Sequence, residues 1–366
     1  MQLPRIVACV VLGLRVCDAG VSSPAPTLKS AFAHAFRVGA ALNPTQFFEE
    51  NAKAVQLITN QFNSISPENV LKWESVHPFP DQYNFVPSDH YVDFGRKYHM
   101  FIVGHNLVWH SQTPGWVFKS IFNFPVTREA LLQRMHDHIM TVVGRYKGKI
   151  GGWDVVNEAL NEDGTLRQTA WMQIIGPDYL VKAYQWAHEA DPKAQLYYND
   201  FSMENPPKRA GGVALIKMLQ AHGIHIAAVG MQGHYRMDWP STNDVNDTIN
   251  AFAALGVKVM ITELDVYNQN PADPHSLSLP ETAQQALAAR YADLFKVFLH
   301  HQKTLTRITF WGVSDGDSWL NSDLPNFPLL FDRQYQPKPA YEAVMALGRA
   351  SKAPPPPVRY KSDRNF

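Results

Sequence analysis

Trp153-Asp154-Val155-Val156-Asn157-Glu158-Ala159 is a short, largely apolar run in which Asn157 and Glu158 lie near the C-terminal end. A second run, Val259-Met260-Ile261-Thr262-Glu263-Leu264-Asp265-Val266, has the same form. Runs of this length that are rich in β-branched residues are typical of buried strands. Each run places a glutamate after three or four apolar positions. We therefore expect two strands, each with a carboxylate at its C-terminal end.

Six more runs of this kind occur along the chain, and helical patterns separate them. The eight expected strands are Phe36–Leu42, Ser64–Glu68, Phe101–Val108, Gly151–Asn157, Gln195–Asp200, Ala227–Gly233, Lys258–Leu264 and Arg307–Val313. Between strands, apolar residues recur at steps of three and four, as from Leu131 to Tyr146 and from Leu287 to Phe298. This alternation predicts an α/β fold, a single (β/α)8 TIM barrel with its active site at the C-terminal ends of the strands.

A doubly wound open sheet is the alternative fold. Such a sheet usually has a glycine-rich phosphate turn after its first strand. The residues at that place, Leu42-Asn43-Pro44-Thr45, do not form one. The closed barrel is therefore favoured.

The composition excludes several classes of protein. Of 366 residues, 45% are apolar and 18% charged, and 33 Lys and Arg balance 33 Asp and Glu. A chain with no net charge has no global field to attract nucleic acid or an anionic membrane. The apolar share excludes intrinsic disorder, and the two cysteines exclude a disulfide-dense scaffold. The 12% of aromatic residues suits neutral, ring-shaped ligands, although a large core would have the same content.

The two ends of the chain are expected to lie outside the barrel. Arg5, the apolar run Ile6–Leu14 and the small-residue site Cys17-Asp18-Ala19 predict a signal peptide over residues 1–19 and a secreted protein, extracellular or periplasmic. A buried first helix and lipidation at Cys17 are the alternatives. We expect a linker at 20–30, the catalytic barrel at 31–350 and a proline-rich polar tail at 351–366.

The two glutamates at strand ends indicate a chemistry. A buried carboxylate is costly unless it is paired or protonated, and two structural salt bridges at the barrel rim are the plain explanation. Strands four and seven, however, end on roughly opposite sides of a barrel mouth. Two carboxylates that face each other across a cleft are what the cleavage of a glycosidic bond requires.

The chain resembles glycoside hydrolase family 10, the endo-β-1,4-xylanases, over about residues 30–350. The resemblance rests on segments in register: Ser66-Pro67-Glu68-Asn69 with Lys72-Trp73-Glu74, Gly104-His105-Asn106-Leu107-Val108-Trp109-His110-Ser111-Gln112, Trp153 to Glu158, Tyr198-Asn199-Asp200, Gly230-Met231-Gln232-Gly233-His234, Ile261 to Asp265, Phe310 to Trp319, and Pro337-Lys338-Pro339-Ala340-Tyr341. It implies endo-acting hydrolysis of xylan and xylo-oligosaccharides by a monomer, without cofactor or metal.

The resemblance also implies roles for individual residues. Glu158 would be the general acid/base and Glu263 the nucleophile of a retaining double displacement. His234 would donate to Glu263 and be held by Asp265, while Asn157 would contact the sugar 2-hydroxyl in the transition state. The substrate-binding residues would be Glu68, Asn69, Lys72, His105, Trp109, Gln112, Tyr198, Asn199, Gln232, Trp311 and Trp319, with Tyr198 and Asn199 toward the leaving group.

Three other functions remain as alternatives. A metal enzyme would need a ligand set, and the close pairs His105 and His110, His136 and His138, and His300 and His301 form no His-Glu-x-x-His motif. A carbohydrate-binding barrel without activity would not need both glutamates. A retaining β-glycanase acting on glucan is the third alternative.

Overall fold

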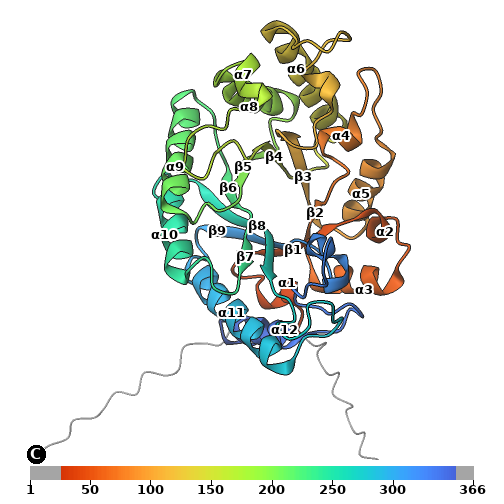
Figure 1. Cartoon of the computed structure of the whole chain (residues 1–366), viewed down its shortest axis with the longest axis vertical. Helices are drawn as coiled ribbons and strands as arrows, with labels where there is room; N and C mark the ends of the chain where they lie inside the picture. The colour runs from red at the N-terminus through yellow and green to blue at the C-terminus, as the bar shows by residue number, and fades with distance from the viewer. Residues whose placement is uncertain (1–25, 352–366) are drawn as a thin grey trace, which may run out of the picture.

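A computed structural model describes residues 26–351, and its centre is a closed ring of parallel strands (Figure 1). The ring consists of β1 (Arg37–Leu42), β2 (Ser64–Pro67), β3 (Phe101–Val108), β4 (Gly152–Asn157), β5 (Gln195–Asp200), β6 (Ala228–Met231), β8 (Lys258–Tyr267) and β9 (Leu305–Phe310). Neighbours in the chain pair with one another, β6 pairs with β8, and β9 closes the ring on β1. The predicted (β/α)8 barrel is confirmed.

Helices surround the ring on its outer side (Figure 1). They are α1 (Leu28–Ala31), α2 (Pro44–Phe47), α3 (Ala52–Gln61), α4 (Trp73–Val76), α5 (Val86–Lys97), α6 (Arg128–Arg145), α7 (Ala170–Ile174), α8 (Asp178–Ala190), α9 (Pro206–Ala221), α10 (Thr242–Ala253), α11 (Glu281–His300) and α12 (Pro339–Ser351). The apolar residues that predicted the helices now called α6 and α11 are buried, from Leu131 to Val142 and from Leu287 to Phe298. Their three- and four-residue spacing places them on the face toward the strands.

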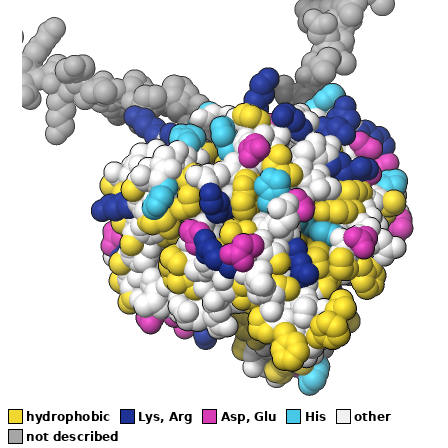
Figure 2. All heavy atoms as spheres, turned by 90° about the horizontal axis from the view of Figure 1, so that it is seen from above, with side chains coloured by type: hydrophobic (Ala, Val, Ile, Leu, Met, Phe, Trp, Pro, Cys, Tyr) yellow, Lys and Arg dark blue, Asp and Glu magenta, His cyan; other side chains and the backbone are white. Residues whose placement is uncertain are grey.

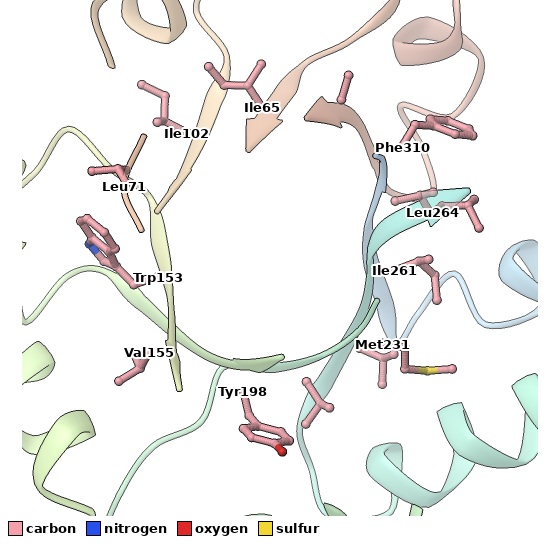
Figure 3. Packing of buried hydrophobic residues seen from close by; sticks show 14 of the residues in the cluster. Ile65, Leu71, Ile102, Trp153, Val155, Tyr198, Met231, Ile261, Leu264 and Phe310 are labelled. Carbon is pink, nitrogen blue, oxygen red and sulfur yellow. The ribbon is translucent and has the colours of Figure 1, made fainter. Parts of the chain in front are cut away.

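The main hydrophobic core lies between the strands and the helices. In Figure 3 Trp153, Val155 and Tyr198 point outward from the ring of strands, and all three are buried. Because side chains alternate along a strand, the residues between them face the inside of the ring. Polar residues such as Asp154 occupy this inner face and are buried there.

The structure corrects several predicted boundaries. The strand expected at Arg307–Val313 runs from Leu305 to Phe310. The strand expected at Ala227–Gly233 ends at Met231, and a short extra strand, β7 (His234–Arg236), follows it. The strand that contains Glu263 continues past Leu264 to Tyr267, because Asp265, Val266 and Tyr267 pair with β7.

The predicted linker is also too long at its C-terminal end. Leu28–Ala31 forms a helix, and Leu28 is part of the hydrophobic core. The signal peptide predicted for residues 1–19 and nearly all of the predicted tail lie outside the described residues.

The surface carries charges of both signs. On the face shown in Figure 2, basic and acidic side chains are intermixed, with apolar side chains between them. This pattern agrees with the equal numbers of Lys plus Arg and Asp plus Glu. Within residues 26–351, no helix combines the length and apolar character that a membrane span needs.

Candidate active site

A cleft of about 540 Å³ opens at the C-terminal ends of the barrel strands. It is lined by Glu68, Asn69, Lys72, His105, Trp109, Gln112, Asn157, Glu158, Phe201, Ser202, Gln232, His234, Glu263, Trp311 and Trp319. The structure therefore brings together in one cleft all of the predicted site residues except Tyr198, Asn199 and Asp265. No group of three or more His, Cys, Asp or Glu side chains in the described part of the chain could hold a metal ion.

Glu263, in the middle of β8, is held by two donors. Its side chain is almost fully buried, with Asn199 Nδ2 at 2.8 Å from Oε1 and His234 Nε2 at 3.1 Å from Oε2. Burial by itself would raise the pKa of Glu263, but the hydrogen bonds from His234 and Asn199 and nearby positive charge lower it. Glu263 is therefore an ionised carboxylate at neutral pH.

His234 is itself fixed by Asp265. The ring atom Nδ1 lies 3.1 Å from Asp265 Oδ1, while Nε2 faces Glu263. Burial acts to lower the pKa of His234, yet the two carboxylates outweigh it and raise the pKa to about 10. The imidazole is thus charged at neutral pH and donates from both nitrogens. The hydrogen-bonded series Asp265–His234–Glu263 expected from the sequence is present.

Glu158 follows directly after β4 and has a backbone φ of 56°, in the left-handed region that few residues other than glycine adopt. Two backbone contacts hold this conformation: the Glu158 N–H donates to the Asn199 carbonyl at 2.9 Å, and Arg167 Nε donates to the Glu158 carbonyl at 3.1 Å. The side-chain oxygen Oε1 accepts from Gln232 Nε2 at 3.0 Å and from Asn157 Nδ2 at 3.3 Å. The carboxyl group of Glu158 is therefore aimed into the cleft by its backbone and by two amides.

Two asparagines connect the glutamates. Asn199 Nδ2 donates both to Glu263 and, at 2.9 Å, to Asn157 Oδ1, and Asn157 in turn donates to Glu158. Thr262 Oγ1 donates to Asn199 Oδ1 at 2.6 Å and so fixes the orientation of that amide. The two carboxyl groups thus belong to one network of hydrogen bonds at the floor of the cleft.

Two predicted substrate contacts are wrong. Tyr198 is completely buried and points away from the centre of the ring, and its hydroxyl donates to Asp200 Oδ2 at 2.5 Å (Figure 3). Asn199 points inward, but it is also fully buried, and its two amide hydrogens are donated to Glu263 and Asn157. Asn199 is a positioning residue for Glu263, and Tyr198 is a core residue.

The other end of the cleft is rich in polar groups. Lys72 Nζ donates to Asn69 Oδ1 at 3.0 Å and to Gln112 Oε1 at 2.8 Å, and it lies 5.0 Å from the centre of the Trp109 ring. Burial lowers the pKa of Lys72. For Glu68, burial and the charge of Asp317 raise the pKa to about 7, although Lys72 opposes them.

Two indole rings form a wall of the cleft beside His234 and Glu263. Trp311 is nearly buried and packs edge-on against His105 and His234, with ring centres 5.5 and 6.3 Å apart. Trp319 is 53% exposed, and its Nε1 donates to Asp265 Oδ2 at 2.9 Å. Trp319 is therefore oriented by the same aspartate that holds His234.

Sequence reasoning missed several residues that shape the site. Phe201 and Ser202 line the cleft just after β5. Asp154 Oδ2 lies 2.9 Å from His105 Nδ1 and holds that imidazole in place, as Thr262 holds Asn199. Simple alternation would not have found these residues together with Asn157 and Glu263, because all four face the inside of the ring. Irregular pairing between Asp154 and Val156 in β4 and between Ile261 and Leu264 in β8 interrupts the alternation.

Comparison with known proteins gives consistent results. The model of the family described as glycosyl hydrolase family 10 matches residues 27–347. The chain is 42% identical to endo-1,4-beta-xylanase A of Xylanibacter ruminicola, over 92% of this chain and 97% of that protein. It is 38% identical to endo-1,4-beta-xylanase B of Paenibacillus barcinonensis, over 89% and 99%. The solved structure of a GH10 endoxylanase from a sugarcane soil metagenome superposes with a TM-score of 0.85 at 42% identity, over 88% of this chain and 99% of the other.

Proposed function

The chain belongs to glycosyl hydrolase family 10, and from this premise we propose how its cleft cuts the β-1,4-xylosidic bonds of xylan. The enzyme is an endo-1,4-β-xylanase, a retaining glycoside hydrolase. In the proposed double displacement Glu263 is the nucleophile and Glu158 the general acid/base. The observation that carries this assignment is that one buried, ionised glutamate and one glutamate with a less enclosed carboxyl group share the cleft and one hydrogen-bond network.

In the first step Glu263 attacks the anomeric carbon of the bound xylose. The bond from that carbon to the glycosidic oxygen breaks, and Glu158 gives its proton to the departing oxygen. The product is a xylosyl ester of Glu263. His234 supports this step because it holds one carboxylate oxygen, Oε2, in a fixed direction.

In the second step water replaces the leaving group. Glu158, now without its proton, takes one from the water as the water attacks the anomeric carbon, and the ester bond to Glu263 breaks. Because esterification has removed the negative charge of Glu263, the ionised Glu158 no longer faces a second negative charge. Two inversions at one carbon leave the configuration of the sugar unchanged.

The distribution of hydrogen-bond donors supports these roles over the reverse assignment. Glu263 accepts from a charged imidazole and from an amide, and these donors lower its pKa and keep it ionised. Among the residues that the structure describes, the carboxyl group of Glu158 accepts only from the neutral amides of Gln232 and Asn157. A residue that must carry a proton in one step and release it in the next suits this less charged environment.

The rest of the cleft suits a neutral polysaccharide. Asn69, Gln112 and Lys72 present amide and ammonium groups to hydroxyls, and Trp109, Trp311 and Trp319 present flat apolar faces. Sugar rings have apolar faces and polar edges, so such a cleft can bind both surfaces at once.

The first experiment replaces Glu158 by Ala. Hydrolysis of xylan should be lost, because its alkoxide leaving group needs a proton, whereas an aryl xylobioside with an acidic phenol should still form the ester. Added azide should then restore turnover, since it attacks the ester without a base. Full activity of Glu158→Ala on xylan would refute the assignment.

The second experiment labels the nucleophile. A 2-deoxy-2-fluoro xylobioside slows both steps, the second more, so the ester should accumulate on the peptide that contains Thr262-Glu263-Leu264 and be found there by mass spectrometry. A label elsewhere would contradict the proposed role of Glu263. Product profiles on xylan, cellulose and mixed-linkage glucan test the substrate, and a preference for either glucan would favour the β-glucanase alternative.

A further inference from the structure

A second cavity, of about 240 Å³, lies at the opposite end of the barrel from the cleft. Its lining residues come from the N-terminal ends of strands: Arg37 from β1, Phe101 from β3, Tyr197 from β5, Lys258 from β8 and Arg307 from β9. The catalytic groups lie at the C-terminal ends of the same strands. The cavity is therefore separate from the active site.

The unusual residue of this cavity is Arg307. Its side chain is only 2% exposed, yet none of its three guanidinium nitrogens has a hydrogen-bond partner among the described residues. The guanidinium carbon lies 5.4 Å from the centre of the Tyr197 ring and 5.9 Å from that of Phe101. Ring faces attract a cation, but they do not replace its five hydrogen bonds.

Two more cations face the same space. Arg37 is the direct cross-strand partner of Arg307 in the parallel pair of β1 and β9, and its guanidinium carbon lies 4.7 Å from the centre of the Phe101 ring. Lys258 lines the cavity as well, with Nζ donating to the Lys303 carbonyl at 2.8 Å. Like charges placed directly opposite each other are destabilising, and no carboxylate is among the residues that line the cavity.

We propose that this cavity binds a small tetrahedral oxyanion, inorganic phosphate or sulfate, between Arg37 and Arg307. Such an anion would accept the hydrogen bonds that Arg307 does not make within residues 26–351 and would offset the repulsion between the two guanidinium groups. Arginine suits this task, because its planar fork donates in pairs to phosphate-like oxygens. Arg37, which is exposed, leaves an entry path from solvent.

The competing explanation is an internal counter-charge. Asp154, on the inner face of β4, has one carboxylate oxygen, Oδ1, without a partner, while Oδ2 contacts His105. Water molecules between Asp154 and Arg307 would then satisfy both groups without any anion. The experiments below distinguish these two arrangements.

The first test measures thermal unfolding of the wild type, of Arg37→Gln and of Arg236→Gln. Arg236 is an exposed arginine on β7, beside the C-terminal end of β8, and serves as the matched loss of one positive charge. Phosphate replaces chloride at constant pH and ionic strength. The melting temperature of the wild type should rise and, above the dissociation constant, gain the same increment for each tenfold increase in phosphate.

The variants separate binding from a general salt effect. Phosphate and sulfate stabilise folded proteins non-specifically, because they are excluded from protein surfaces. This non-specific rise in melting temperature should be equal in all three proteins. Calorimetric titration with inorganic phosphate should give one site in the wild type and Arg236→Gln, and a dissociation constant about tenfold or more weaker in Arg37→Gln. Acetate, a planar carboxylate, should bind less tightly than phosphate or sulfate.

The second test replaces Arg307 by Met, which keeps most of the apolar volume of the side chain. With chloride as the anion, Arg307→Met should melt at or above the wild type, because an uncompensated buried charge has been removed. Phosphate should raise the melting temperature of the wild type more than that of this variant. If Asp154 is the counter-charge, Arg307→Met melts lower in every buffer. That result, or equal phosphate titrations in the wild type and Arg37→Gln, would overturn the proposal.

Discussion

Replacement of Asn199 by Ala tests most directly how the active site is organised. Asn199 is buried beneath the cleft and donates both to Glu263 and to Asn157. Alanine removes the Nδ2 group that makes both hydrogen bonds and also the oxygen that accepts from the Thr262 hydroxyl. If Asn199 positions Glu263, the proposed nucleophile, kcat should fall while KM stays nearly unchanged.

The size of the effect follows from the lost contacts. One hydrogen bond to a charged group contributes about 1.5–3 kcal/mol, so kcat should fall about ten- to a hundredfold. Because a donor to the ionised form of Glu263 is lost, the pKa of Glu263 should rise. The acid limb of the pH profile of kcat/KM should therefore move to higher pH.

The assay is steady-state hydrolysis of an aryl xylobioside across the pH range, with a melting curve for each protein. Asn69→Ala is the matched control, because Asn69 is an exposed cleft residue that contacts Lys72 and Gln112 and makes no hydrogen bond to Glu263. It should raise KM and leave the acid limb in place. A folded Asn199→Ala with raised KM, unchanged kcat and an unmoved acid limb would refute the positioning role and restore the substrate contact predicted from the sequence.

Three further outcomes are expected. Trp319→Ala should lower kcat/KM on an aryl xylobioside and narrow its ratio to that on an aryl cellobioside, because the indole no longer excludes the larger sugar; an unchanged ratio in a folded variant contradicts this steric role. Asp317→Asn removes a negative charge near Glu68, so the pKa of Glu68 should fall below about 7. If KM for xylo-oligosaccharides changes as Glu68 titrates, that change should occur at a lower pH in the variant than in the wild type. Lys338→Met leaves the buried Asp315 carboxylate without its cation, so the free energy of unfolding measured in urea should fall by about 3–5 kcal/mol at pH 8. The loss should be smaller at pH 5, where Asp315 takes up a proton more readily. An equal loss of free energy at both pH values argues against this cause.

Strand positions could be predicted well from the sequence because each barrel strand is a short apolar run between helical patterns. The bounds Phe101–Val108 and Gln195–Asp200 agree with β3 and β5. The extra strand β7 could not be predicted in this way. Its three residues are too few to form an alternating pattern, and they are extended because they pair with the end of β8.

The candidate site shows a similar division. A residue predicted from a family motif lies in the cleft when its side chain points to the inner face of its strand. Tyr198 and Asn199 were treated as one unit, but neighbours on a strand point to opposite faces. Asn199 pairs in register with Asn157, and both face inward, so Tyr198 must face outward. Strand parity would have corrected Tyr198, whereas the two hydrogen bonds of Asn199 depend on side-chain geometry that sequence spacing does not specify.

The backbone conformation of Glu158 has a consequence for the evolution of this enzyme. A left-handed conformation costs a residue with a Cβ about 1–2 kcal/mol, and glycine would adopt it without that penalty. Selection for stability alone would therefore favour the loss of the side chain that we propose transfers the proton. At the proposed acid/base position, the requirements of catalysis and of folding stability are opposed.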